Sequence, residues 1–334
     1  MIPGVSSSNQ RVVPWATRYS RQPGNTATNT NLSAAYVDGS TVYFRDNTDA
    51  DIMSGSDVNA TFTDQTTAGI DAGGWLKFSN SRWFVRNGTG ATMATMTSLG
   101  GTITTVSKDI RDVLWIPQAS LWLAVGDDGA GNCLQTTSTN GTTWTDRADI
   151  FTADRGTGVA TDGTRTNVIG NNNHLWTTTS TTAPFTWSRI TTTGFSAADD
   201  PKWINYIPEK SLWLMTNDNN DLLSYSSNGT TWAVTDMNMN MSGNSGPVNV
   251  LWMPALNRWI AISAGNSTAT SGRGQFISIS DTDSVTGTWS VVLDDSQVDW
   301  FTGVALATIH TFNLNNRYLI SAGTNNRMFY TRAG

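Results

Sequence analysis

Few residues of this chain have a type and spacing suited to catalysis. The sequence contains two histidines, His174 and His310, and a single glutamate, Glu209. Both histidines stand beside apolar, strand-like residues, and no Gly-x-Ser-x-Gly motif provides a nucleophile that either could activate. Glu209 lies in a Pro-Glu-Lys turn, where a solvated side chain is expected. We therefore expect structural histidines and no nucleophile-base pair.

Aspartates are the remaining candidates for acid-base chemistry. Adjacent pairs occur at Asp127–Asp128, Asp199–Asp200 and Asp294–Asp295. A glycosidase needs two carboxylates roughly 5 to 10 Å apart, one of them with a raised pKa. Paired aspartates in loops are more often solvated turn residues. The sequence favours a protein that is not an enzyme, and a glycosidase stays an alternative.

Oxygen ligands suited to Ca²⁺ gather at Asn217–Asp221 and at Asp281–Asp283. Neither segment has the glycine and the terminal acidic ligand of a complete calcium loop, so we expect no metal and no cofactor, and a calcium site stays an alternative. The single cysteine, Cys133, stands in an apolar alternation and is expected to be a small buried hydrophobe.

An internal repeat organises these residues. Three segments align, VLWIPQASLWLAVGDDG from Val113, INYIPEKSLWLMTNDNN from Ile204 and VLWMPALNRWIAISAGN from Val250. In each, a proline precedes a tryptophan by five residues, as in Pro117 and Trp122, Pro208 and Trp213, and Pro254 and Trp259. Degenerate copies begin at Ala34, Leu76, Val159 and His310. Each copy reads as an apolar strand, a short hairpin turn and a second apolar strand.

A second element follows each copy. STNGTTW (Ser138–Trp144) and SSNGTTW (Ser226–Trp232) are nearly identical, and looser forms span 180–187 and 280–289. The pattern predicts a third strand, a tight turn in which glycine supplies positive φ, and a fourth strand opened by the tryptophan. The turn residues are Ser138, Asn140, Gly141, Thr143, Trp144, Ser226, Asn228, Gly229, Thr231 and Trp232.

Four strands per copy, at a period of roughly 38 to 53 residues, are typical of propeller blades. The sequence predicts an all-β fold, a seven-bladed β-propeller of four-stranded antiparallel blades, spanning 32–334. Because a blade cannot bury both faces alone, the repeated positions should form the core between blades. These are Pro117, Trp122, Pro208, Trp213, Pro254, Trp259, Trp289 and Trp15.

The two ends of the chain complement each other. The last copy stops after its third strand, and the N-terminal segment 1–31 holds an unassigned strand at about 11–20, with Trp15 in the place of the fourth-strand tryptophan. We expect this strand to complete the last blade, which removes two exposed sheet edges. The rest of 1–31 is then a linker.

Ser-x-Asn-Gly-x-Thr-Trp resembles the Asp-box, a hairpin turn of sialidase-like β-propellers. Asn140 and Asn228 stand where that family usually has aspartate, and either side chain can bond its own turn. The resemblance implies a structural role at the blade periphery. Sialidase activity is not implied, because the sequence has no Arg-Ile-Pro motif and its lone glutamate, Glu209, lies in a turn.

Composition narrows the partners. The net charge of −6 and the absence of Lys/Arg clusters argue against nucleic acid, and no apolar stretch is long enough for a membrane helix. The first residues have neither a basic region nor an apolar run of the kind found in a signal peptide, so we expect synthesis in a cytoplasm.

The Thr/Asn/Gly-rich texture resembles propeller domains of bacteriophage virion proteins, which implies a structural or attachment module of a virion. Its partners would be other virion proteins and a host-surface glycan or protein. The alternative is a glycan-binding lectin, for which the aromatic candidates outside the repeat are Trp75, Trp203 and Trp300.

Overall fold

The computed structural model describes most of the chain between its two ends. The described residues are 15–19, 32–38, 41–46, 52–55, 63–65, 70, 74–87, 92–191, 193–196, 199–217, 220–239, 247–263, 277–293, 311–314, 317–322 and 327–331. His310, Trp300 and the Asp294–Asp295 pair lie outside these residues.

The described strands form four-stranded antiparallel sheets, six of which consist of four strands consecutive in the sequence. Sheets one to three comprise β2 (Leu32–Asp38), β3 (Thr41–Asp46), β4 (Ile52–Gly55) and β5 (Thr63–Asp64); β6 (Leu76–Ser79), β7 (Arg82–Arg86), β8 (Met93–Met96) and β9 (Thr104–Val106); and β10 (Asp109–Ile116), β11 (Leu121–Asp127), β12 (Cys133–Ser138) and β13 (Thr145–Arg147). Sheets four to six comprise β14 (Gly156–Thr161), β15 (Thr166–Gly170), β16 (His174–Thr178) and β17 (Ser188–Arg189); β18 (Pro201–Ile207), β19 (Leu212–Asn217), β20 (Leu222–Ser226) and β21 (Ala233–Asp236); and β22 (Pro247–Met253), β23 (Arg258–Ser263), β24 (Ile277–Ser280) and β25 (Trp289–Leu293).

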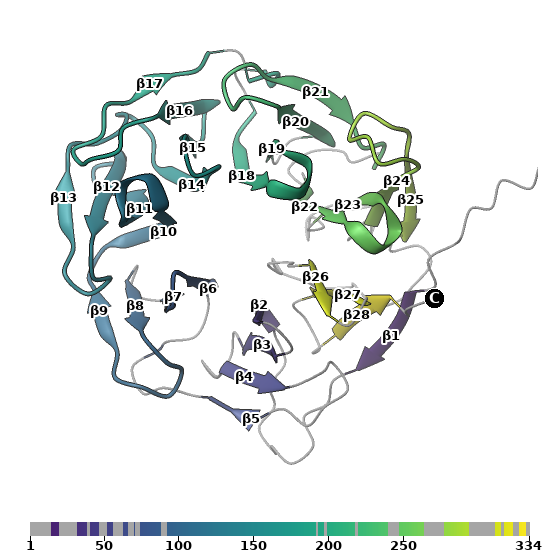
Figure 1. Ribbon diagram of the computed structural model, residues 1–334, viewed down its shortest axis with the longest axis horizontal. Coiled ribbons are helices and arrows are strands. Elements are labelled where there is room, and N and C mark those ends of the chain that lie inside the picture. The colour runs from purple at the N-terminus through teal and green to yellow at the C-terminus, as the bar shows by residue number, and fades with distance from the viewer. Residues whose placement is uncertain are drawn as a thin grey trace, which may run out of the picture.

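A further four-stranded sheet joins the two ends of the chain, in the order β1-β28-β27-β26. Its strands are β1 (Trp15–Tyr19), β26 (Thr311–Leu314), β27 (Arg317–Ala322) and β28 (Arg327–Thr331). β1 pairs antiparallel with β28, from Trp15 opposite Thr331 to Tyr19 opposite Arg327. In Figure 1 the purple β1 lies beside the yellow strands at the right of the ring.

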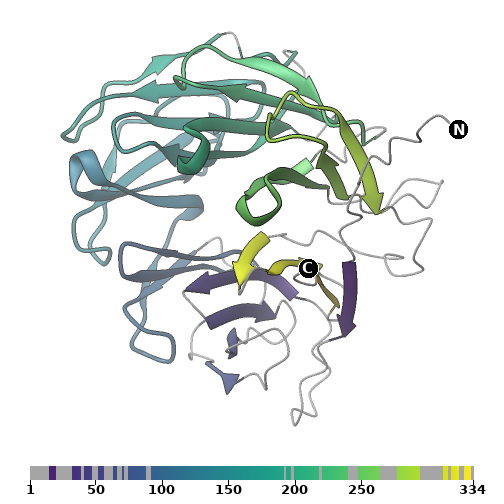
Figure 2. The ribbon, with the colours of Figure 1, turned by 45° about the vertical axis from the view of Figure 1, so that its right-hand side comes forward.

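The sheets follow one another around a common centre (Figures 1 and 2). In sheets one to six the first strand is innermost and the fourth outermost, and in the sheet of the two chain ends β26 is innermost and β1 outermost. Because each of sheets one to six has an even number of antiparallel strands, the chain enters and leaves every sheet on the same side of the ring. We call this side the loop face; it carries the connections between sheets and those between second and third strands. The opposite side, the turn face, carries the first-to-second and third-to-fourth connections.

The inner strands share an irregularity near their start. The pairing register with the second strand shifts at 110–112, 156–158, 201–203, 247–249 and 32–34. A β-bulge of this kind increases local twist. The bulge recurs in five of the six sheets that are consecutive in the sequence, and the β6–β7 pairing of sheet two has none.

The core lies in the seams between neighbouring sheets. Phe84 and Met93 of sheet two pack with Trp122 of sheet three, and Leu214 of sheet five packs with Trp259 of sheet six. Tryptophans 213, 259 and 289 are at most 1% exposed, as expected for side chains that fill the space between two sheets. Each such aromatic removes roughly 150 to 250 Å² from water, so the seams hold most of the favourable burial.

Three short 3-10 helices connect first and second strands on the turn face. They are η1 (Pro117–Ala119), η2 (Pro208–Lys210) and η3 (Pro254–Leu256), each followed by a residue in the left-handed region. The prediction that Pro117, Pro208 and Pro254 belong to the repeat core is wrong, because all three are exposed. Proline recurs here for its fixed φ and missing N–H, which suit the first position of a helical turn.

The described part of the chain contains no α-helix, and accordingly none that could cross a membrane.

Candidate functional site

A hollow of about 730 Å³ opens on the loop face beside sheets two and three. Four connections contribute to it: β7–β8, β9–β10, β11–β12 and the segment after β13. We call it the acidic hollow, because it has five aspartates against one lysine and one arginine. Its lining residues are Thr92, Ser107, Lys108, Asp109, Asp127, Asp128, Gly129, Gly131, Leu134, Asp146, Arg147 and Asp149.

Asp109 is the best-compensated carboxylate of the hollow. It accepts hydrogen bonds from Arg86 Nη2 at 2.9 Å and from Arg111 Nη2 at 2.8 Å. Burial acts to raise the pKa of Asp109, but the hydrogen bonds and charges of the two arginines outweigh it and hold the pKa below its usual value. Asp109 is therefore ionised at neutral pH and ties sheet two to sheet three.

Asp127 and Asp128 organise their own loop. Asp127 Oδ1 accepts the N–H groups of Gly129 and Gly131, at 2.8 and 3.3 Å. Asp128 Oδ1 accepts those of Ala130 and Asn132, while its Oδ2 accepts Asn132 Nδ2 at 2.8 Å. Hydrogen bonds from the backbone and then the side chain of Asn132 lower the pKa of Asp128. These two carboxylates are structural anchors of a turn.

Asp149 differs from its neighbours. It is exposed, and within the described part of the chain its carboxylate takes part in no hydrogen bond or ion pair. Burial and the nearby charge of Asp128 raise the pKa of Asp149. Lys108 cannot compensate it fully, because Lys108 is already paired with Asp146 at 2.6 Å. Asp149 is thus the group of the hollow most available to a positively charged ligand.

The hollow is poorly equipped for hydrolysis. A raised pKa at Asp149 and a lowered one at Asp128 are the pattern of an acid-base pair. Both oxygens of Asp128, however, accept hydrogen bonds from its own loop, so this carboxylate holds a turn in place as well as facing solvent. Among the described residues no three acidic, histidine or cysteine side chains are arranged to hold a metal ion.

The loops singled out for calcium are otherwise engaged. Asn217 and Asn220 bond each other, with Asn217 Nδ2 donating to Asn220 Oδ1 at 2.8 Å, and residues 218 and 219 lie outside the described residues. Asp283 is paired with Lys210 at 3.3 Å. Asp199 is buried and receives the backbone N–H of Ser196 and the side chain of Asn220.

The two Asn-Gly turns, Ser138–Trp144 and Ser226–Trp232, lie on the turn face between third and fourth strands. In the first, Asn140 Oδ1 accepts the N–H groups of Thr142 and Thr143 at 2.9 and 2.8 Å, and Ser138 Oγ accepts that of Gly141 at 2.8 Å. The second turn repeats every one of these bonds.

The aromatic ends of these turns depart slightly from prediction. Trp232 is buried, but Trp144 is only half-buried. The fourth strand begins one residue after the tryptophan in both turns, at Thr145 and Ala233, and begins on the tryptophan itself only in β25. The indole of Trp144 donates to Gly141 O at 3.2 Å and so belongs to the turn.

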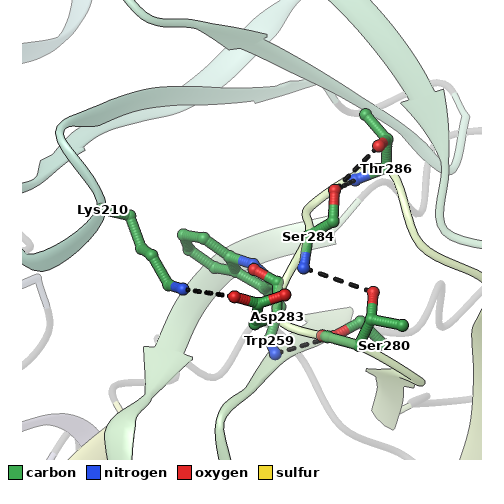
Figure 3. Close-up of polar contacts among 7 residues, drawn as sticks. Lys210, Trp259, Ser280, Asp283, Ser284 and Thr286 are labelled. Atoms are coloured by element: carbon green, nitrogen blue, oxygen red, sulfur yellow. Dashed lines mark hydrogen bonds and ion pairs between the residues drawn. The ribbon is translucent and has the colours of Figure 1, made fainter.

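These turns contact the preceding sheet. A Cβ atom on Gly141 would collide with the side chain of Arg82, and one on Gly229 would lie 2.8 Å from Arg165 Cδ. The corresponding turn of sheet six meets Lys210, whose Nζ is paired with Asp283 (Figure 3). The same Nζ lies 3.7 Å from the centre of the Trp252 ring. In three seams, therefore, a cationic side chain of one sheet rests on the turn of the next.

The other chemically capable residues serve the fold. His174 Nδ1 accepts the indole N–H of Trp176 at 3.3 Å, and its ring stacks on Phe151. Burial and the charge of Arg189 lower the pKa of His174, so it is neutral at neutral pH. Glu209 is exposed within η2. Cys133 is fully buried, and burial raises the pKa of its thiol well above the usual value.

Two of the aromatic candidates for sugar binding are described, and both pack into seams. Trp75 is half-buried against the cluster between sheets two and three, and Trp203 against that between sheets five and six. Both side chains therefore contribute to packing between sheets.

Sequence reasoning missed the acidic hollow. Lys108, Asp146 and Asp149 carried no signal of their own, because the hollow is made by four connections that no contiguous motif links. The Asp127–Asp128 pair was the only hint, and it was correctly interpreted as a turn.

Comparison with known proteins shows what the fold resembles. A scan against protein-family models found no match, and a search of curated proteins found none either. Solved structures do match. Virginiamycin B lyase from Staphylococcus aureus superimposes with a TM-score of 0.68 at 9% identity, covering 96% of this chain and 100% of that chain. YCF48 from Cyanidioschyzon merolae gives 0.63 at 14% identity, covering 95% and 98%.

A GH74 xyloglucanase from Xanthomonas campestris also matches, with a TM-score of 0.63 at 13% identity over 94% of this chain and 53% of that chain. These neighbours are β-propellers, and the all-β sheets described above confirm the predicted fold at that level. At such low identity the likeness shows the fold alone. The neighbours include enzymes and non-enzymes, so they do not decide between the two for this chain.

Proposed function

We propose that this protein is a non-enzymatic structural or attachment module of a bacteriophage virion, built as a seven-bladed propeller that its N-terminal strand closes. The pairing of β1 with β28 supports the closure, since it supplies the fourth strand that the last copy lacks. Closing the ring between the two ends of the chain gives a rigid disc, which suits a part that displays loops to a partner.

The observation that carries the proposal is the engagement of the acidic hollow's carboxylates. Asp109, Asp127 and Asp128 are held by arginines or by their own loop, while the hollow stays open and keeps an excess of negative charge. Preorganised charge around an open cavity favours recognition of an oppositely charged group. Hydrolysis would require a second carboxylate positioned as a base beside Asp149, and Asp128 is engaged by its own loop.

The partner that best fits the hollow is an exposed protein segment carrying lysine or arginine. Asp149 offers an unpaired carboxylate to such a side chain, and a cationic group would also relieve its repulsion with Asp128. One structural neighbour, YCF48, has been solved bound to a D1 peptide. That likeness supports a peptide-sized ligand for a propeller of this shape, at 13% identity and a TM-score of 0.61.

A peptide array tests the recognition. Purified chain should bind lysine- and arginine-rich peptides over neutral and acidic ones, more weakly as salt increases. Asp149→Lys should abolish this binding, whereas the control Asp283→Lys, an exposed aspartate on the turn face, should not. Equal binding by wild type and Asp149→Lys would reject the hollow as the docking site.

The virion role and the absence of catalysis need separate measurements. Immunogold electron microscopy of purified virions, with antibody raised against the chain, should label the particles. Unlabelled particles would rule out a virion part. Strong signals on a glycan array would favour the lectin alternative, and release of reducing sugar from mixed polysaccharide would show a glycosidase.

A further inference from the structure

The asparagine of each of these two Asn-Gly turns is chemically prone to deamidation. An asparagine followed by glycine is the sequence most prone to spontaneous deamidation, because glycine has no side chain to obstruct attack. The amide nitrogen of Gly141 would attack Cγ of Asn140, so that a C–N bond forms, the Cγ–Nδ2 bond breaks and ammonia leaves with the proton of the Gly141 amide. Water then opens the succinimide to aspartate or isoaspartate.

The atoms that must react are the ones that the turns hold most tightly. The N–H of Gly141 donates to Ser138 Oγ at 2.8 Å, and that of Gly229 donates to Ser226 Oγ at 2.9 Å. The same two hydroxyls donate to the asparagine Oδ1 atoms, each at 3.1 Å. One serine therefore restrains both the nucleophile and the electrophile of its turn.

Further donors fix the asparagine side chain over the turn. Asn140 Oδ1 also accepts two backbone N–H groups, those of Thr142 and Thr143. Closing the five-membered ring requires Cγ to swing toward the glycine nitrogen, which breaks these bonds together. The reaction then requires local opening of the turn. Its rate equals the rate in the open turn multiplied by the fraction of molecules in which the turn is open.

We propose that Asn140 and Asn228 are deamidation sites that the folded turns keep unreacted, with Ser138 and Ser226 as the positioning residues that do so. The two products would fare differently. Aspartate offers the same acceptor atom, with a charge that strengthens its hydrogen bonds. Isoaspartate lengthens the backbone by one carbon, so the bonds that define the turn cannot re-form.

The two turns should not be equally protected. Asn228 Oδ1 accepts one more hydrogen bond, from Thr230 Oγ1 at 3.0 Å. The carbonyl of Gly229 accepts Nδ2 of the fully buried Asn167 at 2.9 Å, whereas that of Gly141 accepts only from the half-buried Trp144. Asn140 should therefore react before Asn228.

Peptide mapping by mass spectrometry tests the proposal, with the intact chain incubated at 37 °C and mildly alkaline pH. Both asparagines should deamidate at least about tenfold more slowly in the folded chain than in guanidinium chloride, as expected for a reaction gated by local opening. Equal rates in folded and denatured chain would overturn the proposal.

Variants then isolate the serines. Ser138→Ala should accelerate deamidation at Asn140 severalfold and leave Asn228 in the same sample unchanged, and Ser226→Ala should do the reverse. Ser138→Thr, which keeps the hydroxyl, should restore protection of Asn140. If Ser138→Ala changes neither rate, or raises both equally through general loosening, the serine is not the protecting group.

Discussion

The turn face and the loop face of the propeller differ in how their charged side chains are used. On the turn face, Arg82, Arg165 and Lys210 each rest on a turn of the following sheet. On the loop face, the acidic hollow keeps more negative than positive charge and leaves Asp149 unpaired among the described residues. The loop face also joins sheets two and three, through Arg86 and Asp109 at 2.9 Å. The two faces differ in what remains: the hollow keeps a carboxylate, that of Asp149, with which no described residue pairs.

The largest change should come from removing the proposed closure. Deleting residues 1–22 removes β1 and leaves β28 as an exposed edge, with its pairing from Trp15 to Tyr19 lost. Because the deletion exposes the edge of β28 and removes the pairing that links the two ends of the chain, we expect loss of cooperative unfolding and aggregation. Circular dichroism melts and light scattering measure this. A truncated chain that melts within a few degrees of the full one would show that β1 does not close the ring.

Trp213→Ala tests the seam beneath the turn face. Trp213 is fully buried between sheets four and five, and its indole lies against Gly229. We expect a loss of about 3 to 5 kcal/mol in the free energy of unfolding, from lost burial and the cavity left behind. Guanidinium titration measures it. Peptide binding per folded molecule, a property of the other face, should stay unchanged, and parallel loss of both would deny that the faces are independent.

Arg165→Ala removes one cation of the turn face without opening the core. Arg165 packs on Gly229 and donates to Thr177 Oγ1 at 3.0 Å. We expect a loss of about 1 to 2 kcal/mol, since the packing of its stem is lost with the hydrogen bond. Arg189→Ala, at an exposed position in the same sheet, is the matched control and should cost much less. Equal effects would mean that contact with the next sheet contributes nothing.

The sequence also predicted the two faces unequally well. Trp122, Trp213 and Trp259 recur at a fixed distance from a turn. Repetition of a large apolar residue predicts that it packs between neighbouring sheets. The same repetition led to a wrong prediction for Pro117, Pro208 and Pro254. These prolines recur because each begins a 3-10 turn, and in the sequence such a repeat cannot be distinguished from a repeated core position. The acidic hollow has no such signal. Its residues meet only after two sheets pack, and Lys108 and Asp149 are far apart in the chain.

The smallest effects should separate two carboxylates within the acidic hollow. Asp109 has a lowered pKa, so it stabilises the fold above the pKa of the unfolded chain and loses this contribution as pH falls through its folded value. Asp149 has a raised pKa, so the fold is relatively more stable at low pH and loses that advantage as pH rises through its folded value.

Substitution by asparagine should therefore have opposite signs at neutral pH. Asp109→Asn should destabilise by up to about 1 kcal/mol, because Arg86 and Arg111 lose a partly solvent-screened partner. Asp149→Asn should stabilise slightly, and both differences should shrink as acid protonates the wild-type carboxylates. Unfolding titrations at pH 7 and pH 3 measure them. If Asp149→Asn instead destabilises at pH 7, its carboxylate already has a favourable partner, and the hollow is not a site short of positive charge.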